Sequence, residues 1–315
     1  KTTTKELINA VLSRKFKTVA TKGNLNNHIG VPLTLLSITK ETEIAIVEMG
    51  ANHQKEIEFL CSIAEPNFGY ITNFGKAHLE GFGGVEGVIK GKSELYDFLR
   101  KTNGLAFVNF DDDIQLEKTL GIKTVSFDIN SDFIEFIEAN PFVKIRFNEV
   151  VIQTQLIGRY NVNNIAAAIT IGMFFKVPEK DIKKAIENYV PSNNRSQLIK
   201  IGSNTIFMDA YNANPSSMKV ALENFNQIEE KSKVVILGDM FELGDDSLKE
   251  HQAIADLVAS FNFAQAYLIG HHFSSIQIKN AQQFPTFDDF KISFNLNDVQ
   301  KSTILIKGSR GMALE

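Results

Sequence analysis

The chain has 315 residues, of which 43% are hydrophobic and 22% charged, a composition typical of a soluble globular protein and not of a disordered one. At roughly 150 residues per domain, this length predicts about two domains and excludes a single small one. The formal net charge of −4 gives no basic excess, so nucleic acid is not expected as the main partner.

Cysteine content and hydropathy argue against a disulfide-linked or cysteine-zinc protein and against a membrane protein. Cys61 is the only cysteine, which excludes an intrachain disulfide and a zinc site built from several cysteines. A reducing, cytoplasmic compartment is therefore expected. No apolar run approaches the roughly 18 residues that a membrane helix needs, and the first ten residues lack the apolar core of a signal peptide, so membrane insertion is not expected.

Between residue 16 and about residue 127, short apolar runs alternate with helical periodicity, which predicts βαβ units around a largely parallel sheet. The predicted strands lie in FKTVAT, IAIVEMG, FGYITNF, GLAFVNF and KTVSF. Residues 132–157 contain closely spaced strand-like runs with no helix between them, which predicts an antiparallel extension. Helices are predicted at about 160–175 and 179–188.

A polar stretch with a proline, PSNNRSQ, places a domain boundary near residue 196. Beyond it, TIFMDAY, KVVILG, AQAYLIG and STILIKG alternate with helices predicted at about 215–229 and 247–259 and one more. The predicted fold class is α/β: a mostly parallel, P-loop-type sheet domain over residues 1–196, then a smaller Rossmann-like α/β domain over 197–315.

Polar side chains follow several of the predicted strands at the point where each strand ends. They are Glu48, Asn73, Asp209 and Asp239. Because open α/β sheets bind ligands at the carboxyl ends of their strands, these positions are candidate site residues. For Asp239, capping of the next helix explains the residue equally well.

The first residues, KTTTK, lead directly into an amphipathic helix. This pattern is similar to the end of a P-loop, whose Lys contacts the β and γ phosphates and whose following Thr ligates Mg²⁺, here Lys1 and Thr2. The glycine half of the motif is absent, so an ordinary helix start is the alternative. If the P-loop interpretation is right, we expect a strand and a Gly-rich turn to precede Lys1.

Lys92 lies on the apolar face of a helix predicted at about 85–99, whereas Lys90 and Glu94 are expected on the opposite face. The apolar face is made of Val85, Val88, Ile89, Leu95, Tyr96 and Leu99. Burial disfavours the charged amine, so the pKa of Lys92 is expected to fall and the neutral amine to become available for chemistry. The alternative is a lysine whose charged end reaches solvent at the rim of the core.

Four more residues are weaker candidates. His78 follows a strand end in the glycine-rich KAHLEGFGG and is a candidate for metal or phosphate contact, with a structural role as the alternative. Arg195, beside the predicted boundary, can reach a phosphate or form a surface ion pair. His271 and His272 are expected to begin a helix and to serve as capping or solvated residues.

Taken together, a series of segments resembles the Mur ligases of peptidoglycan synthesis in content and order. The segments are KTTTK, GNLNNHIGVPLTLL, EMGA, ITNFGKAHLEGFG, GKSEL, GRYNVNNIAAAI, DAYNANPSSM, LGDMFELG and KGSRGM. The resemblance covers nearly the whole chain. Two parts of the family pattern are absent: the N-terminal domain, which holds the UDP-sugar in the family, and the P-loop glycines. The chain as given is therefore expected to be a fragment that is inactive by itself.

The resemblance implies an ATP-dependent amide ligase that joins D-alanyl-D-alanine to UDP-N-acetylmuramoyl-tripeptide through an acyl phosphate. It implies ATP, two Mg²⁺ ions and a CO₂-derived carbamate as requirements, and a monomer is expected. The alternatives are another amide ligase of the superfamily, such as a folylpolyglutamate synthase, and a nucleotide-binding module that has lost ligation. The third residue of the tripeptide cannot be predicted from this chain.

The resemblance also implies roles for individual residues. Lys1 would contact the phosphates, Thr2 and Glu48 would ligate Mg²⁺, and His78 and a carbamylated Lys92 would serve the second ion. The nucleotide would also contact Thr3, Asn161, Asn164, Arg195, Asp209, Tyr211, Asn212 and Asn214. The amino substrate would meet Lys307, Ser309 and Arg310. Gly91 stands where the family is expected to have alanine, a departure expected to be harmless.

Overall fold

The computed structural model describes residues 1–76, 78–129, 133–191 and 197–315. It divides into two compact units: residues 1–75, 81–155 and 159–190 form the first, and residues 76–80, 156–158 and 191–315 form the second. The predicted boundary near residue 196 and the candidate Arg195 lie outside the described residues. None of the helices in the described ranges is both long and apolar enough to cross a membrane.

The first unit contains two small parallel sheets. Strands β1 and β2 pair in parallel in one, and β3, β4 and β5 pair in parallel in the other. The parallel pairing confirms the prediction, but the strands form two sheets where one was expected. The elements in order are α1 (Thr2–Leu12), β1 (Thr18–Ala20), α2 (Gly30–Leu36), β2 (Ile44–Ile46), α3 (Glu56–Ala64), β3 (Phe68–Tyr70), α4 (Leu79–Phe82), α5 (Val85–Thr102), β4 (Leu105–Asn109), α6 (Asp113–Lys118) and β5 (Lys123–Phe127).

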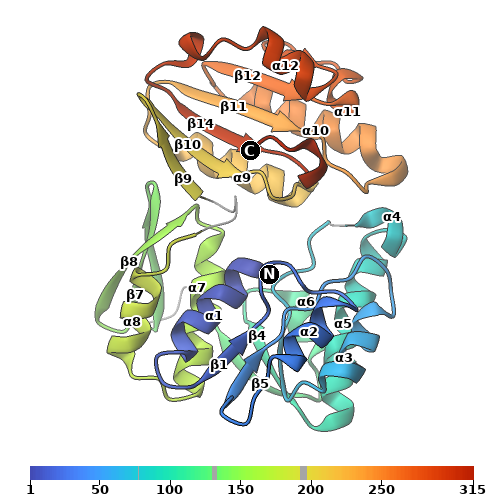
Figure 1. Ribbon diagram of the computed structural model, residues 1–315, viewed down its shortest axis with the longest axis vertical. Coiled ribbons are helices and arrows are strands. Elements are labelled where there is room, and N and C mark those ends of the chain that lie inside the picture. Colours follow the sequence, from blue (N-terminus) through green and yellow to red (C-terminus); the bar gives the residue numbers. More distant parts are fainter. Residues whose placement is uncertain (77, 130–132, 192–196) are drawn as a thin grey trace. The chain divides into compact units, whose positions relative to one another are not determined.

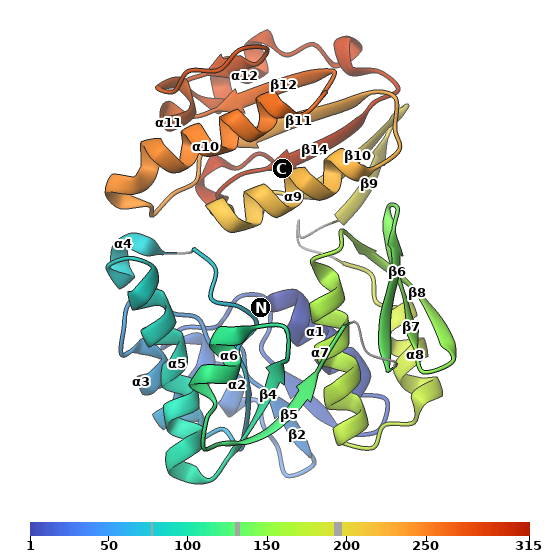
Figure 2. The same cartoon turned by 180° about the vertical axis from the view of Figure 1, so that it is seen from behind.

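A three-stranded sheet and two helices complete the first unit. They are β6 (Ile134–Ala139), β7 (Phe142–Phe147), β8 (Val150–Ile157), α7 (Asn161–Phe174) and α8 (Glu179–Glu187). Strands β6 and β7 pair antiparallel, which confirms the predicted antiparallel extension. Helices α1 and α7 lie side by side (Figures 1 and 2). A Cβ atom at Gly172 would lie 2.5 Å from Cγ1 of Val11, so glycine permits this close approach.

The second unit is a six-stranded sheet in the order β13-β12-β11-β14-β10-β9 (Figure 1). The pairs are parallel except for the antiparallel β9 and β10, which confirms the α/β class and the predicted parallel sheet. Its elements are β9 (Gln197–Ile201), β10 (Asn204–Asp209), α9 (Pro215–Gln227), β11 (Lys233–Gly238), η1 (Gly244–Asp246), α10 (Ser247–Ser260), β12 (Gln265–Ile269), α11 (His271–Ser274), β13 (Gln282–Phe284), α12 (Phe287–Ser293), η2 (Leu296–Val299), β14 (Thr303–Lys307) and η3 (Arg310–Met312).

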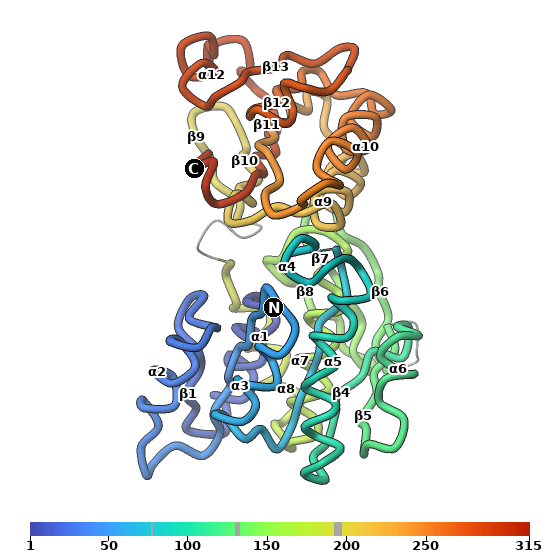
Figure 3. The backbone as a smooth tube through the Cα atoms, turned by 90° about the vertical axis from the view of Figure 1, so that its right-hand side faces the viewer, coloured from blue at the N-terminus to red at the C-terminus, as the bar shows by residue number. Residues whose placement is uncertain are grey.

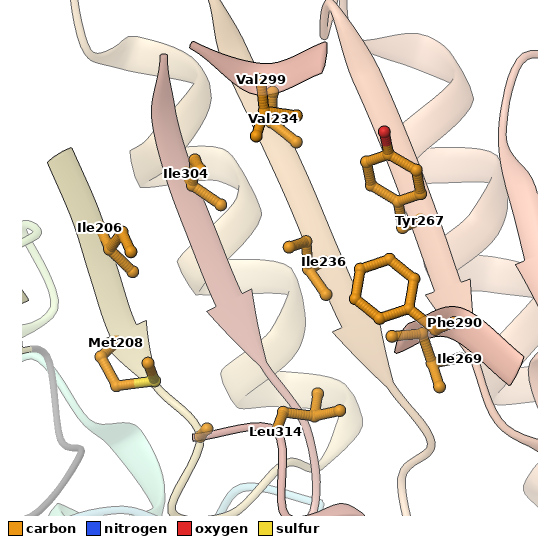
Figure 4. Close-up of a cluster of buried hydrophobic side chains, with 11 residues drawn as sticks. Ile206, Met208, Val234, Ile236, Tyr267, Ile269, Phe290, Val299, Ile304 and Leu314 are labelled. Carbon is orange, nitrogen blue, oxygen red and sulfur yellow. The ribbon is translucent and has the colours of Figure 1, made fainter. Parts of the chain in front are cut away.

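Helices cover both faces of this sheet (Figure 3). On one face, Ile206, Ile236 and Ile304 project from neighbouring strands toward Phe290 of α12 (Figure 4). On the other face, Phe207 packs against Phe225 of α9 with ring centroids 5.7 Å apart. Alternate residues of one strand therefore enter opposite cores, as strand geometry requires.

Asp239 serves as a helix cap. It follows β11 and is buried, and its two carboxylate oxygens accept hydrogen bonds from the backbone N–H groups of His272 and Phe273, each at 3.0 Å. A Cβ at Gly270, whose φ is +130°, would lie 2.2 Å from Cγ of Asp239, so glycine is required there. Of the two explanations for Asp239, capping is the one that the structure supports, and His271 begins α11 as expected.

His251 is fully buried beside this cap and is held in its neutral form. Nδ1 donates to the carbonyl of Ser247 at 2.7 Å, and Nε2 accepts from the backbone N–H of Met240 at 3.0 Å. Burial lowers its pKa from 6.5, with Asp239 and His272 as charged or titratable neighbours.

We expect this buried histidine to make stability depend on pH. As the pH falls through 6.5 the unfolded chain takes up a proton that folded His251 resists, so stability is full above pH 6.5 and is lost below it. This group contributes a slope of up to about 1.4 kcal/mol per pH unit. Urea unfolding between pH 5.5 and 7.5 should therefore show a flatter dependence for His251→Gln than for the unchanged protein. Equal slopes would contradict the prediction.

Candidate functional site

Glu48 is the centre of a buried polar network in the first unit. It follows β2, and its side chain is 5% exposed. Its Oε1 accepts hydrogen bonds from the hydroxyl of Thr2 at 3.2 Å and from Nδ2 of Asn26 at 2.7 Å. Its Oε2 is buried and has no hydrogen-bond partner among the described residues.

The pairing of two short strands explains why these groups meet. Strands β1 and β2 run parallel with Ala20 opposite Ile46, so their carboxyl ends lie at one edge. There the hydroxyl of Thr21 accepts a hydrogen bond from the backbone N–H of Glu48 at 2.9 Å. The buried ammonium of Lys5 donates to the carbonyl oxygen of Thr21, which ties α1 to the same edge.

The residues present suit a divalent cation. A buried carboxylate oxygen without a partner is costly, and a cation beside Oε2 of Glu48 would remove that cost. Mg²⁺ prefers oxygen ligands and takes only one or two carboxylates, with water and phosphate oxygens completing its shell. The Thr2 hydroxyl and Glu48 fit this pattern. No group of three or more His, Cys, Asp or Glu side chains arranged for a metal occurs in the described part of the chain.

Lys92 lies in α5 and has the perturbed amine that the sequence predicts. Burial, and secondly repulsion from Lys1, lower the pKa of Lys92 from 10.5 to about 8. Its Nζ donates to the carbonyl oxygen of Asn73 at 2.9 Å. Thr2 bonds to Glu48, and Lys1, the residue before Thr2, repels the Lys92 ammonium, so these four candidates from separate segments of the sequence belong to one region of the first unit.

Two expectations for α5 are wrong. Glu94 is buried, and its carboxylate accepts from the backbone N–H groups of Lys55 at 2.6 Å and Glu58 at 2.9 Å, which caps the start of α3. Helix phase alone cannot anticipate a carboxylate that is buried to satisfy another helix. Val85 is 41% exposed because it is the first residue of α5.

Gly91 makes room for an aromatic ring. A Cβ there would lie 2.5 Å from Cε1 of Phe82, whose side chain is buried. The expected family alanine would therefore meet this ring.

We expect the cost of Gly91→Ala to depend on Phe82. Overpacking costs about 1–3 kcal/mol, whereas alanine in a helix gains about 1 kcal/mol over glycine. Urea unfolding should show Gly91→Ala to be destabilising in the unchanged protein and less so, or stabilising, in a Phe82→Leu background. Lys90→Ala, on the exposed side of α5, is the control. The same effect of Gly91→Ala in both backgrounds would refute the coupling.

His78 belongs with residues of the second unit. Its Nδ1 pairs with the carboxylate of Glu242. In the same segment, Lys76 forms an ion pair with Glu250 at 2.7 Å, and its backbone N–H donates to the hydroxyl of Ser216 at 3.1 Å. The metal contact proposed for His78 stays a prediction.

Asn161 and Asn164 join α7 to α1. The side-chain carbonyl of Asn164 accepts from the Thr4 hydroxyl at 2.7 Å, and its amide donates to Asn161 at 2.8 Å. Asn161 is buried, and Thr3 on α1 is partly exposed. These contacts give both asparagines a packing role, and their contact with adenine stays a prediction.

The nucleotide and amino-substrate candidates of the second unit form one cluster. Asp209 and Lys307 are register partners at the ends of β10 and β14. The Lys307 side chain is buried, and its Nζ donates to Asp209 at 2.6 Å and to the carbonyl oxygen of Asn212 at 3.1 Å. Beside them, the Arg310 guanidinium lies 5.3 Å from the ring centroid of Tyr211.

Ser309 and Asn214 have structural partners in the same region. The hydroxyl of Ser309 accepts the backbone N–H of Phe241 at 2.9 Å. Asn214 caps α9, and Ser217 returns a hydrogen bond to it. Sequence reasoning missed Lys5, Thr21 and Asn26. They lie in segments that the sequence singled out, KTTTK, FKTVAT and GNLNNHIGVPLTLL respectively, but no role was predicted for any of the three.

Comparisons with known proteins match both units. Residues 1–172 match the Mur ligase middle domain, and residues 194–310 match the family described as Mur ligase, glutamate ligase domain. The chain is 31% identical to UDP-N-acetylmuramoyl-tripeptide–D-alanyl-D-alanine ligase of Bacillus subtilis, over 100% of this chain and 72% of that protein. It is 32% identical to the Escherichia coli protein of the same name, over 100% of this chain and 73% of that protein.

Solved structures give the same result. The fold is similar to MurF from Acinetobacter baumannii, with a TM-score of 0.87 and 32% identity over 99% of this chain and 72% of that chain. It is also similar to MurF ligase from Thermotoga maritima in complex with ADP, with a TM-score of 0.83 and 25% identity over 99% of this chain and 74% of that chain.

Proposed function

Because this chain belongs to the Mur ligase family, we propose that it carries the catalytic units of an enzyme that joins D-alanyl-D-alanine to UDP-N-acetylmuramoyl-tripeptide at the expense of ATP. The observation that carries the proposal is the linked group of Lys1, Thr2, Glu48 and Lys92 in the first unit. The names of the relatives that match the whole chain support the choice of substrates. A monomer in the cytoplasm is part of the proposal.

The proposed reaction activates a carboxylate before an amine attacks it. A carboxylate is a poor electrophile, so the γ-phosphoryl group of ATP is first transferred to the terminal carboxylate of the tripeptide, giving an acyl phosphate and ADP. The free amine of D-alanyl-D-alanine then attacks the acyl carbon. An amide bond forms, the bond to phosphate breaks, and the amine loses a proton. No nucleophile from the protein is needed, so binding, orientation and charge stabilisation are its contributions.

Charge stabilisation falls to the residues proposed for the phosphates and for Mg²⁺. Lys1 would neutralise phosphate oxygens, and Thr2 and Glu48 would hold Mg²⁺. When bound, Mg²⁺ withdraws charge from the phosphoryl oxygens. His78 and Lys92 would serve a second Mg²⁺. A pKa of about 8 leaves roughly a tenth of Lys92 at pH 7 as the neutral amine, far more than for an ordinary lysine, and this form would add CO₂ and release a proton to give a carbamate.

The remaining candidates are proposed to bind the nucleotide and the amino substrate. Thr3, Asn161, Asn164, Arg195, Asp209, Tyr211, Asn212 and Asn214 are proposed for ATP, and Lys307, Ser309 and Arg310 for D-alanyl-D-alanine. The contact of Arg310 with Tyr211 supports this assignment, because it brings a candidate for each ligand into one cluster.

The test is phosphate release from ATP by the full-length protein. With UDP-N-acetylmuramoyl-tripeptide present, release is expected only when D-alanyl-D-alanine is added, and mass spectrometry should find the pentapeptide product. Nucleotide binding without phosphate release on any amino acceptor would overturn the proposal and favour a non-catalytic module. Release that needs a folate as the carboxylate donor and glutamate as the acceptor would instead favour a folylpolyglutamate synthase.

A further inference from the structure

Asn26 contacts Glu48 through its side chain and Gly50 through its backbone. Its Nδ2 donates to Oε1 of Glu48 at 2.7 Å, and its backbone carbonyl accepts from the N–H of Gly50 at 2.7 Å. A Cβ at Gly50 would lie 2.8 Å from Oδ1 of Asn26, so the side chain packs directly on the glycine backbone. Asn26 therefore occupies a space that only glycine at position 50 leaves open.

This arrangement makes the two oxygens of Glu48 unequal. A carboxylate only accepts hydrogen bonds, so the Nδ2 group of Asn26, the donor end of the amide, faces it. The Thr2 hydroxyl also donates to Oε1, whereas Oε2 has no partner among the residues described. Two donors on one oxygen hold the plane of the carboxylate and leave the other oxygen for a ligand.

We propose that Asn26 is a positioning residue that holds Oε1 of Glu48 and thereby presents Oε2 to a divalent cation. The inference rests on the proposed function, because it takes Glu48 as a cation ligand. Asn26 acts through Glu48 and does not touch the cation. Partners in this position orient a ligand, and their loss typically weakens metal affinity 10- to 100-fold.

The neighbouring Asn27 provides a matched control. Its Oδ1 accepts from the backbone N–H groups of Ile29 at 3.1 Å and Gly30 at 3.0 Å, so it caps the start of α2. Its contacts are local, whereas those of Asn26 reach the carboxylate. Asn27→Ala should therefore lower stability without changing cation affinity.

Direct binding of Mn²⁺ alone to the full-length protein, followed by electron paramagnetic resonance, tests the inference. Asn26→Ala should weaken Mn²⁺ binding at least about tenfold, and Asn27→Ala should leave it unchanged. Gly50→Ala should reproduce the loss with Asn26 still present, because the new methyl group displaces its amide. This second variant, with thermal unfolding of each protein, keeps the test valid if Asn26→Ala does not fold.

The spectrum of bound Mn²⁺ gives a readout that loop packing alone would not change. If Asn26 fixes the orientation of the Glu48 carboxylate, its loss alters the ligand geometry of the cation. At saturating Mn²⁺ the electron paramagnetic resonance line shape should therefore change in Asn26→Ala and stay the same in Asn27→Ala.

Glu48→Gln distinguishes a failure of the proposed metal role of Glu48 from a failure of the positioning role of Asn26. If Glu48→Gln binds Mn²⁺ as the unchanged protein does, the metal role in the proposed function is wrong. If Glu48→Gln loses Mn²⁺ but Asn26→Ala and Gly50→Ala bind it with unchanged affinity and an unchanged spectrum, the positioning role of Asn26 is overturned and Glu48 remains the ligand.

Discussion

Lys92→Arg is expected to reduce pentapeptide formation by at least about 100-fold, the range seen when one electrostatic group is removed from an active site. Arginine keeps the positive charge and the length of the side chain, but its guanidinium stays protonated and cannot form a carbamate. The substitution therefore separates two roles for Lys92. A cation that only neutralises phosphate would survive it, and an amine that must accept CO₂ would not.

Labelled bicarbonate and carbon-13 NMR give a readout of Lys92 that does not depend on turnover. A carbamate resonance is expected in the unchanged protein and in the control Lys90→Arg, which lies on the exposed side of the same helix. It should be absent in Lys92→Arg. Because the amine becomes neutral as the pH rises through about 8, the signal should grow over that range. Full activity of Lys92→Arg, or a signal that persists in it, would rule out the carbamate role.

The elements with strong local signals were predictable from sequence. The parallel strands of the second unit and α7 to α10 follow from apolar runs and helical periodicity, because these segments bury whole faces. The short parallel strand β13 and the antiparallel strand β9 were missed. Strand β9 shows why. Three of its five residues are only partly buried and the other two are exposed, and it pairs with β10 alone, so its sequence has no clear apolar pattern.

Site residues were predictable where a polar or charged side chain stands in an apolar segment. They were not predictable where a side chain only hydrogen-bonds to another site residue or to a helix end. Glu48 and Lys92 conflict with their apolar surroundings, and that conflict is visible in the sequence. Asn26 and Glu94 do not conflict with anything local. Their roles depend on contacts with segments 22 and 36 to 39 residues away, which only the fold brings together.

The pairing of Asp209 with Lys307 predicts a large effect on stability. Asp209→Asn leaves the ammonium of Lys307, whose side chain is 3% exposed, without its carboxylate. Loss of one partner of a buried ion pair costs roughly 3–5 kcal/mol, and the 20% exposure of Asp209 places this pair near the lower end. Urea unfolding should show this loss, and adding Lys307→Met should recover most of it by removing the uncompensated charge.

The same pair of variants separates folding from nucleotide binding. If Asp209 acts only on the ribose, Asp209→Asn should weaken ADP binding in calorimetry and leave the free energy of unfolding unchanged, which would contradict the ion-pair prediction. The structure predicts a loss of stability in any case, because the carboxylate already has a partner in Lys307. Any deficit in ADP affinity of the restabilised double variant relative to Lys307→Met then measures the direct contact of Asp209 with the nucleotide, free of the cost of a buried charge.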